Sequence, residues 1–391
     1  MGGRFIEVIP TKKIGLRKSV FAPAGLDRSP PAYWEESCAD SECTLHQISP
    51  YIGKLKSVIA GDLIERYSKP GDLLVDPFAG SGTIPLEGAL RGRGVFASDI
   101  SPYARVLSKA KLLAPATLDD ALRRAEAALD AATCLPGPDL SQVPRWVRSF
   151  FHPRTLAEAL NFAAVARKQG KEFILACFLG ILHHQRPGFL SYPSSHLVPY
   201  LRSRKYPRTR YAGMYSYRDL RPRILAKIKR VYRRFSDPRV APRITFRQSA
   251  VEHIVLPESF DCLITSPPYM NALDYGRDNR LRLWFIDPSL SRPVDNGVTQ
   301  RRHAFIKAMR CLAAKVEFGL KRKGHCVIIV GESLKRSFQA HPSKTVVEIM
   351  ANCAKSLRLK LVIADDIPDI RRTRRECRGV RTEHFLVFQK E

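Results

Sequence analysis

Two short loops, each directly after an apolar run, carry residue types that could hold two reacting groups. The first has the sequence DPFAGSGT at residues 76–83 and follows the apolar run 73–75. The second has the sequence TSPPY at residues 265–269 and follows the run 260–264. Both apolar runs read as strands, so each loop is expected at the end of a strand. Neither loop alone identifies a reaction, but together they predict a paired site for an amine and for a methyl donor.

The second loop is suited to hold a planar amino group. Pro267 and Pro268 restrict the backbone, so that the Ser266 side chain and the Pro267 carbonyl can face one point as hydrogen-bond acceptors. An amine that donates both N–H bonds there is favoured in a pyramidal form, whose lone pair can attack a sulfonium methyl without a strong base. Tyr269 offers a flat face on which a base could stack. In isolation a Pro-Pro pair more often marks a rigid turn, but its position after a strand favours a site.

The first loop is suited to bind a nucleoside. Gly80 and Gly82 permit a tight turn, and the helix expected at 84–91 points its first N–H groups at the loop. Asp76 could accept from an amino group of the donor, and Asp99, at the end of the next strand, could bind both ribose hydroxyls. A dinucleotide site would need a third glycine, where this chain has Pro85. The pattern therefore favours a methyl donor over a nicotinamide dinucleotide.

The elements around these loops predict an α/β fold with a doubly wound sheet. Strands alternate mostly with helical patterns, which is typical of such sheets. A near-continuous apolar run such as 327–330 suits a strand covered on both faces, and the last strand could pair antiparallel at an edge. The seven expected strands are 73–75, 95–98, 244–246, 262–264, 326–330, 361–364 and 384–388.

A long helical and basic segment interrupts this core. We expect an N-terminal core part at 1–115, an insertion at 116–242 and a C-terminal core part at 243–391. Helical patterns at 118–132, 155–169 and 173–183 lead into residues 200–249, which hold thirteen Arg and three Lys against two Asp. Six tyrosines interleave with these cations, which suits phosphates and bases, although a solvated basic helix over packed tyrosines would look the same. The predicted nucleic-acid contacts are Arg202, Arg204, Arg208, Arg210, Arg371 and Arg372.

Composition favours nucleic acid as the partner. The chain has 391 residues, 45% hydrophobic content and a formal net charge of +28. We expect a protein without a membrane span, without a secretory signal and therefore cytoplasmic. Nine scattered cysteines indicate reduced thiols, and Cys38, Cys43 and His46 supply only half of a zinc site, so no metal is expected. A hydrolase reading of the serines and histidines near 183–196 lacks the glycine pattern of a nucleophile turn.

The two loops and their strands resemble the S-adenosylmethionine-dependent DNA amino-methyltransferases, the N-4 cytosine and N-6 adenine DNA methylases. The resemblance covers about two-thirds of the chain and implies a seven-stranded class I, Rossmann-like sheet with S-adenosylmethionine as cofactor. It implies that Phe78 packs near the donor and that Ile100 flanks adenine. The segment 46–54 looks like the motif that closes over the methionine end, although it could be a simple turn before a helix. The implied cofactor-binding residues are Tyr51, Lys54, Asp76, Phe78, Gly80, Gly82, Thr83, Asp99 and Ile100, and the implied catalytic residues are Ser266, Pro267, Pro268 and Tyr269.

The resemblance also orders the candidate substrates. Serine in the first position of the Ser-Pro-Pro-Tyr motif, here Ser266, is typical of N4-cytosine enzymes, whereas aspartate is more usual for N6-adenine. A site-specific cytosine N4 methyltransferase therefore leads and adenine N6 follows. Ring-carbon methylation is disfavoured because the chain has no Pro-Cys pair, and glutamine methylation would require Asn at Ser266. An RNA base methyltransferase and a non-catalytic DNA-binding subunit remain as alternatives. A restriction endonuclease is a possible partner of such an enzyme.

Overall fold

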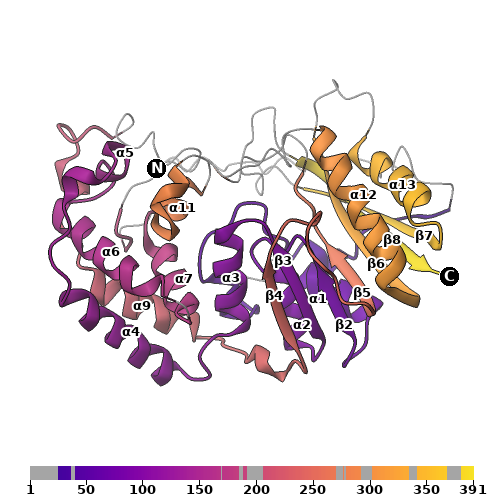
Figure 1. The fold of residues 1–391 in the computed structure, drawn as a ribbon, viewed down its shortest axis with the longest axis horizontal. Coiled ribbons are helices and arrows are strands. Elements are labelled where there is room, and N and C mark those ends of the chain that lie inside the picture. Colours follow the sequence, from indigo (N-terminus) through magenta and orange to yellow (C-terminus); the bar gives the residue numbers. More distant parts are fainter. Residues whose placement is uncertain are drawn as a thin grey trace, which may run out of the picture.

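The computed structural model describes residues 25–36, 40–168, 170–184, 188–191, 206–269, 276, 279–291, 302–333, 341–367 and 380–391. In these ranges the strands form a sheet of eight strands in the order β1-β7-β8-β6-β5-β2-β3-β4. Figure 1 shows this sheet on one side of the molecule and a group of helices on the other. The strands are β1 Asp27–Arg28, β2 Leu73–Asp76, β3 Gly94–Asp99, β4 Ile244–Gln248, β5 Phe260–Thr265, β6 Leu320–Ser333, β7 Leu357–Asp366 and β8 Val380–Lys390.

The strand order creates a switch point between β2 and β5. The chain runs outward from β2 through β3 to β4, and then returns to pair β5 with the opposite edge of β2. All of these pairs are parallel, whereas β8 is antiparallel to both β6 and β7. In such sheets ligands bind outside the carboxyl ends of the strands at the switch point. The fold thus directs both sequence-predicted loops to one place.

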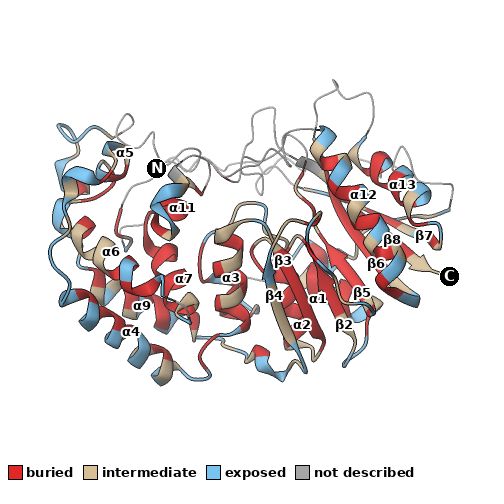
Figure 2. Ribbon diagram, in the orientation of Figure 1, coloured by how far each residue is buried: buried red, intermediate tan, exposed pale blue. Residues whose placement is uncertain are grey.

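Helices cover both faces of the sheet, and the pattern of β6 explains why. Val327 and Ile329 pack with α1 Ser57–Tyr67 on one face, whereas Ile328 and Val330 pack with α12 Arg302–Gly319 and α13 Pro342–Cys353 on the other. Alternate side chains of a strand point to opposite faces, so a strand that is buried twice must be apolar throughout. Figure 2 shows this buried centre of the sheet.

A helical body occupies the other side of the molecule (Figure 1). Its helices from the segment 116–242 share one hydrophobic core with residues from outside that segment, chiefly those of α3 Pro102–Leu112 and α11 Arg280–Ile286. Trp284 and Phe285 of α11 are buried in this core. The body is therefore joined to the sheet through α3 and α11. Its remaining helices are α4 Leu118–Thr133, α5 Arg145–Arg148, α6 Pro153–Ala166, α7 Glu172–Ile181 and α9 Leu220–Val231.

The predicted fold class is confirmed, with one strand that the sequence did not indicate. Each of the seven expected strands lies within β2 to β8. The additional strand, β1, has only two residues and pairs parallel with β7. No apolar run marks so short a strand, which explains the omission. None of the helices in the described ranges is long and apolar enough to cross a bilayer.

The close contact between α7 and the segment that follows Cys43 predicts that one added methyl group, at Gly180, destabilises the fold. A Cβ added at Gly180 would overlap the backbone oxygen of Ile48, whereas a Cβ at Gly137 would meet open space. We expect Gly180→Ala to lower the free energy of unfolding by about 1–3 kcal/mol, because the rigid backbone oxygen must move. Urea denaturation of both variants measures this, with Gly137→Ala as the control. Equal stability of the two variants would contradict the packing of Gly180 against Ile48.

Candidate active site

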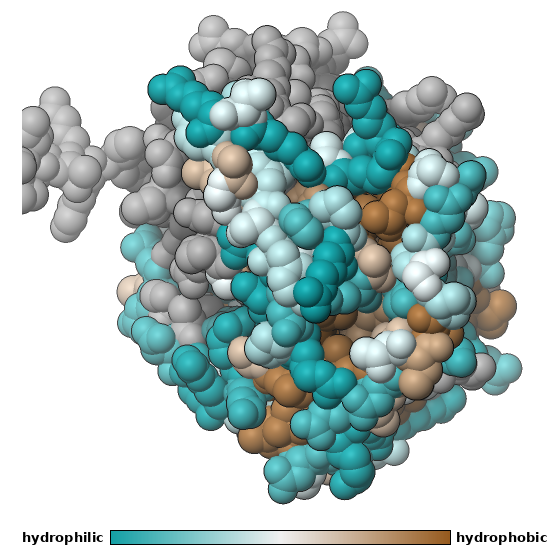
Figure 3. Space-filling view, turned by 90° about the vertical axis from the view of Figure 1, so that its left-hand side faces the viewer, coloured by the Kyte–Doolittle hydropathy of each residue, from teal (hydrophilic) through white to brown (hydrophobic). Residues whose placement is uncertain are grey.

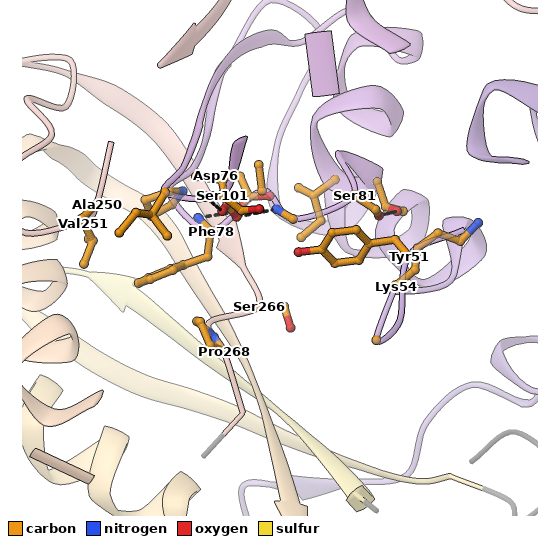
Figure 4. Close-up of a pocket in the computed structure, with 18 of the residues that line it drawn as sticks. Tyr51, Lys54, Asp76, Phe78, Ser81, Ser101, Ala250, Val251, Ser266 and Pro268 are labelled. Carbon is orange, nitrogen blue, oxygen red and sulfur yellow. Dashed lines mark hydrogen bonds between the residues drawn. The ribbon is translucent and has the colours of Figure 1, made fainter. Parts of the chain in front are cut away.

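One cavity lies where the loops after β2, β3, β4 and β5 meet. Figure 4 shows Tyr51 and Lys54 on one side of it, Ala250 and Val251 on the opposite side, and Ser266 with Pro268 facing Asp76 and Phe78. Residues from both sequence-predicted loops thus line the same cavity. Its lining comprises Tyr51, Gly53, Lys54, Leu55, Asp76, Pro77, Phe78, Ala79, Gly80, Ser81, Thr83, Ile84, Asp99, Ile100, Ser101, Pro102, Ser249, Ala250, Val251, Glu252, Ser266, Pro268, Gly276 and Leu283.

A hydrogen bond between neighbouring strands fixes the two loops relative to each other. Thr265 Oγ1, at the end of β5, donates to Asp76 Oδ1, at the end of β2, over 2.6 Å. The same carboxylate oxygen accepts from the backbone N–H of Phe78 at 3.1 Å. Asp76 is only 2% exposed, and burial raises its pKa to about 7 despite these two donors. Ser266 follows Thr265 directly, so this bond positions the second loop, residues 265–269, beside the first loop, residues 76–83. These are the amine loop and the donor loop, named after the groups that the sequence predicts for them.

The glycine turn is held by the carboxylate of Asp99. The N–H of Gly80 donates to Asp99 Oδ2 and the N–H of Ser101 donates to Oδ1, both at 2.8 Å. Gly80 has φ +49, in the left-handed region that side chains rarely adopt. Burial raises the pKa of Asp99, although the backbone donors oppose that shift. Asp99 therefore shapes the turn, and its oxygens lie at the cavity where a ribose could bind them.

A buried lysine supports the same turn from behind. Lys111 Nζ of α3 donates to the backbone oxygen of Ser81 at 2.5 Å. The residue is 1% exposed, and burial lowers its pKa to about 7. Gly82 has φ +74, and a Cβ there would meet Ser108 Oγ of α3 at 2.7 Å. Gly82 is absent from the cavity lining, so its role here is the close approach of α2 Thr83–Leu90 to α3.

The segment before α1 forms one wall of the cavity. The ring of Tyr51 packs over Gly80 and stacks on Tyr103, with 5.8 Å between the ring centroids. Tyr103 in turn donates to the backbone oxygen of Pro50 at 2.7 Å. Lys54 Nζ donates to the backbone oxygen of His46 at 3.2 Å, which folds the segment back on itself. Tyr51 and Lys54 thus both line the cavity.

The Ser-Pro-Pro-Tyr loop differs from the expectation at two of its four residues. Ser266 and Pro268 line the cavity, but Pro267 and Tyr269 do not. Tyr269 is 6% exposed and its hydroxyl donates to Glu383 Oε1 at 2.7 Å, while Ser266 Oγ donates to the Tyr269 hydroxyl at 3.2 Å. The ring lies against Gly331 of β6. In this arrangement the ring of Tyr269 packs against the sheet and is not a free platform for a base.

Eight of the nine cofactor-binding predictions line the cavity: Tyr51, Lys54, Asp76, Phe78, Gly80, Thr83, Asp99 and Ile100. Sequence reasoning missed the wall made by residues 249–252, after β4. The signal was present, because the strand at 244–246 was expected and residues beyond the carboxyl end of a parallel strand belong to the same edge. Only Ala250 and Val251 of this wall are apolar, and the wall has neither the glycine turn nor the proline pair that marks the other two loops.

The predicted nucleic-acid residues fall into two groups. Arg202, Arg204, Arg371 and Arg372 lie outside the described residues. Arg208 is exposed, yet its guanidinium donates to the backbone oxygens of Arg148 and Phe151 and lies 4.7 Å over the ring of Tyr215. Arg210 is exposed beside Tyr211.

Part of the charge in residues 200–249 is structural. Lys227 is 8% exposed and donates to the backbone oxygen of Gln47 at 2.7 Å. Tyr215 and Tyr232 donate to the backbone oxygens of Tyr206 and Pro115, so these tyrosines pack inward. The face of the helical body nevertheless remains mostly hydrophilic (Figure 3). The sequence count of cations therefore overstates the charge that a ligand could meet.

The raised pKa of Asp76 predicts how stability depends on pH. The pKa of Asp76 in the folded protein is about 7, above its ordinary value of 3.8. The contribution of protonated Asp76 to the free energy of unfolding is therefore complete below about pH 4 and is lost as pH rises through about 7. We expect Asp76→Asn to become more stable relative to the wild type as pH rises from about 5 to about 8. Urea denaturation at both pH values measures this, with exposed Glu126→Gln of α4 as the control. A stability difference that stays constant or reverses with pH would contradict the assignment.

The comparisons with known proteins point to one class of domain. Residues 50–137 match the family model described as the RMKL-like methyltransferase domain. A segment of 68 residues is 34% identical to the Type II methyltransferase M.MjaII of Methanocaldococcus jannaschii, and it spans 17% of this chain and 13% of that protein.

Solved structures with a similar fold include TrmN from Thermus thermophilus and the rRNA methyltransferase aviRa from Streptomyces viridochromogenes. TrmN has 11% identity and a TM-score of 0.36, over 89% of this chain and 52% of its own. The aviRa structure has 11% identity and a TM-score of 0.35, over 91% and 93% of the two chains. The strand order, the cavity at the switch point and the matched family model identify a class I methyltransferase domain whose cofactor is S-adenosylmethionine.

Proposed function

We propose that this chain methylates the exocyclic amino group of a nucleic-acid base, with cytosine N4 in DNA as the first candidate. The observation that carries the proposal is the shared cavity: Ser266 of the amine loop and Gly80 of the donor loop both line it. The hydrogen bond from Thr265 to Asp76 keeps these loops in register. A methyl donor and an amine that bind to the two loops would meet in one enclosed space.

The donor side fits S-adenosylmethionine by the chemistry of its walls. Asp99 places carboxylate oxygens where ribose hydroxyls can donate, and Phe78, Ile100 and Val251 offer apolar surface to an adenine ring. Asp76 lies where an ammonium group could pair with it, and such a pairing would favour its ionised form. When bound, S-adenosylmethionine supplies an electrophilic methyl group on a positively charged sulfur.

The amine side acts by position and hydrogen bonding. Ser266 Oγ donates to Tyr269 and keeps lone pairs with which to accept an N–H bond of the substrate. The sequence predicts the carbonyl of Pro267 as a second acceptor, but Pro267 is absent from the cavity lining, so the proposal rests on Ser266. Orientation of the amine nitrogen toward the donor methyl group accounts for much of the expected rate, because a bimolecular reaction becomes effectively unimolecular. A base from a duplex would be flipped out of the stack before it reached this cavity.

The choice of nucleic acid rests on the excess of basic residues and on the serine of the loop. The net charge of +28 favours an extended polyanion. DNA leads because serine in this loop is typical of the N4-cytosine DNA methylases. Adenine N6 in DNA is next, followed by a base in RNA. A non-catalytic DNA-binding subunit is disfavoured because Asp76, Asp99 and Ser266 all line the cavity. A partner restriction endonuclease and cytoplasmic localisation remain part of the same proposal.

Nucleoside mass spectrometry tests the proposed function directly. Purified protein is incubated with isotopically labelled S-adenosylmethionine and with duplex DNA of mixed sequence, and separately with RNA. We expect label in N4-methylcytosine from DNA. Label in N6-methyladenine or in an RNA nucleoside would replace the leading candidate by an alternative. Binding of the donor without transfer to any nucleic acid would instead indicate a non-catalytic role.

The same assay tests the role of Ser266. We expect Ser266→Ala to bind the donor with unchanged affinity, because the serine lies on the amine loop, while methyl transfer falls by about 100-fold through loss of orientation. Isothermal titration with S-adenosylhomocysteine separates the two effects. The exposed Ser141→Ala is the matched control and should behave as wild type. Transfer that is unchanged in Ser266→Ala would remove this residue from the mechanism.

Salt dependence tests contact with phosphate. Log Kd for duplex DNA should change linearly with log salt, with a slope near 0.9 per phosphate contacted. We expect Arg210→Ala to reduce that slope by about 0.9, the value for one phosphate contact. Tm should not change, since the side chain is exposed. Arg208→Ala should lower Tm, because it breaks the bonds to Arg148 and Phe151. A flat salt response would contradict nucleic-acid binding through these cations.

A further inference from the structure

A chain of hydroxyl groups leads from the cavity to a carboxylate on β8. Ser266 Oγ donates to the Tyr269 hydroxyl at 3.2 Å, and that hydroxyl donates to Glu383 Oε1 at 2.7 Å. Each donor therefore points away from the cavity and toward Glu383. The remaining lone pairs of Ser266 are available to a group inside the cavity.

The surrounding strands fix the middle of this chain. Glu383 lies on β8 between β6 and β7, where its register partners are Gly331 and Asp365. A Cβ at Gly331 would come within 2.5 Å of the ring of Tyr269. The missing side chain at Gly331 thus makes room for that ring, which is 6% exposed. This packing holds the hydroxyl of Tyr269 between Ser266 and Glu383.

We propose that Glu383 receives the proton that the substrate amine loses during methyl transfer, through Tyr269 and Ser266. This inference rests on the function proposed above. The amine nitrogen forms its bond to the methyl carbon as the carbon–sulfur bond breaks, and the sulfur keeps that electron pair and becomes a neutral thioether. The nitrogen then releases one proton to Ser266 Oγ. Ser266 passes its own proton to Tyr269, and Tyr269 passes its proton to Glu383, so the positive charge lost by sulfur is balanced by protonation of the carboxylate.

The electrostatic surroundings of Glu383 suit a group that must both accept and release a proton. Enclosure raises the pKa of Glu383 to about 7, the bond from Tyr269 opposes that shift, Asp365 on β7 adds to it and Lys56, before α1, opposes it. Gly331, its neighbour on β6, carries no charge. A carboxyl group with its pKa near the working pH is an effective proton acceptor. Glu383 as a whole residue is of intermediate exposure, whereas its carboxyl group is enclosed beside Tyr269.

The pH profile of kcat in Glu383→Gln tests the relay. Because Glu383 must be ionised to accept the proton, we expect wild-type kcat to rise with pH through about 7. In Glu383→Gln we expect kcat at pH 8 to fall by about 100-fold, and the rise of kcat with pH near 7 to disappear. KM for both substrates should stay the same. Glutamine can still accept from Tyr269, so the fold should persist, and Tm reports this. The titration of Asp76, on the donor side, affects KM for the donor and is retained in the variant.

Two further variants separate a relay from a structural role. Tyr269→Phe interrupts the chain, so it should lower kcat to a similar extent, and the double variant with Glu383→Gln should be no slower than either single one. Asp365→Asn removes a like charge, so the rise of kcat with pH should move to lower pH without disappearing. Additive losses, or an unchanged rise of kcat with pH in Glu383→Gln with normal Tm, would overturn the relay.

The two proposals fail in different ways. If the wild type transfers methyl groups to a base and Glu383→Gln does so at the same kcat and pH profile, the relay is wrong while the proposed function stands. If the wild type binds the donor but methylates neither DNA nor RNA, the proposed function is wrong and the relay falls with it.

Discussion

The hydrogen bond from Thr265 to Asp76 is the contact on which the site depends. It joins the ends of two strands, β5 and β2, that are far apart in the sequence and adjacent in the sheet. Both groups are buried, so water cannot replace the bond if it is broken within the folded protein. Because of this bond, the alignment of β5 with β2 sets the distance between the donor turn and the amine loop. A displacement of either strand would deprive the buried Asp76 carboxyl of the Thr265 donor and would also separate the two halves of the cavity.

Much of the structure around the cavity serves to hold the donor turn still. Asp99 bonds to two backbone N–H groups, Lys111 bonds to the oxygen of Ser81, and Tyr51 packs over Gly80. The amine loop is fixed in a different way, through the hydroxyl of Tyr269 and the strand that carries Glu383. The first arrangement is one of shape and backbone geometry, whereas the second is a chain of exchangeable protons. This difference matches the different tasks proposed for the two sides, which are to bind a cofactor and to deprotonate an amine.

The sequence predicted the sheet and most of the cavity because both follow from local patterns. Apolar runs marked β2 to β8, and the glycine turn with two acidic strand ends marked the donor side. Tyr269 was harder to predict, because its position depends on Gly331 and Glu383, more than sixty and one hundred residues away, respectively. The inward orientation of Lys227 likewise depends on tertiary packing. Residue types alone do not show which arginines bond to backbone oxygens, as Arg208 does.

A crystal structure with bound S-adenosylhomocysteine tests the central claim, that the two strand-end loops form one site. The account predicts the ribose at Asp99, the adenine between Ile100 and Val251, and the sulfur directed toward Ser266, with space for one methyl group and a planar amine between them. A ligand bound outside this cavity would contradict the account. So would a ligand within it whose sulfur points away from Ser266 and is closed off from it by protein atoms.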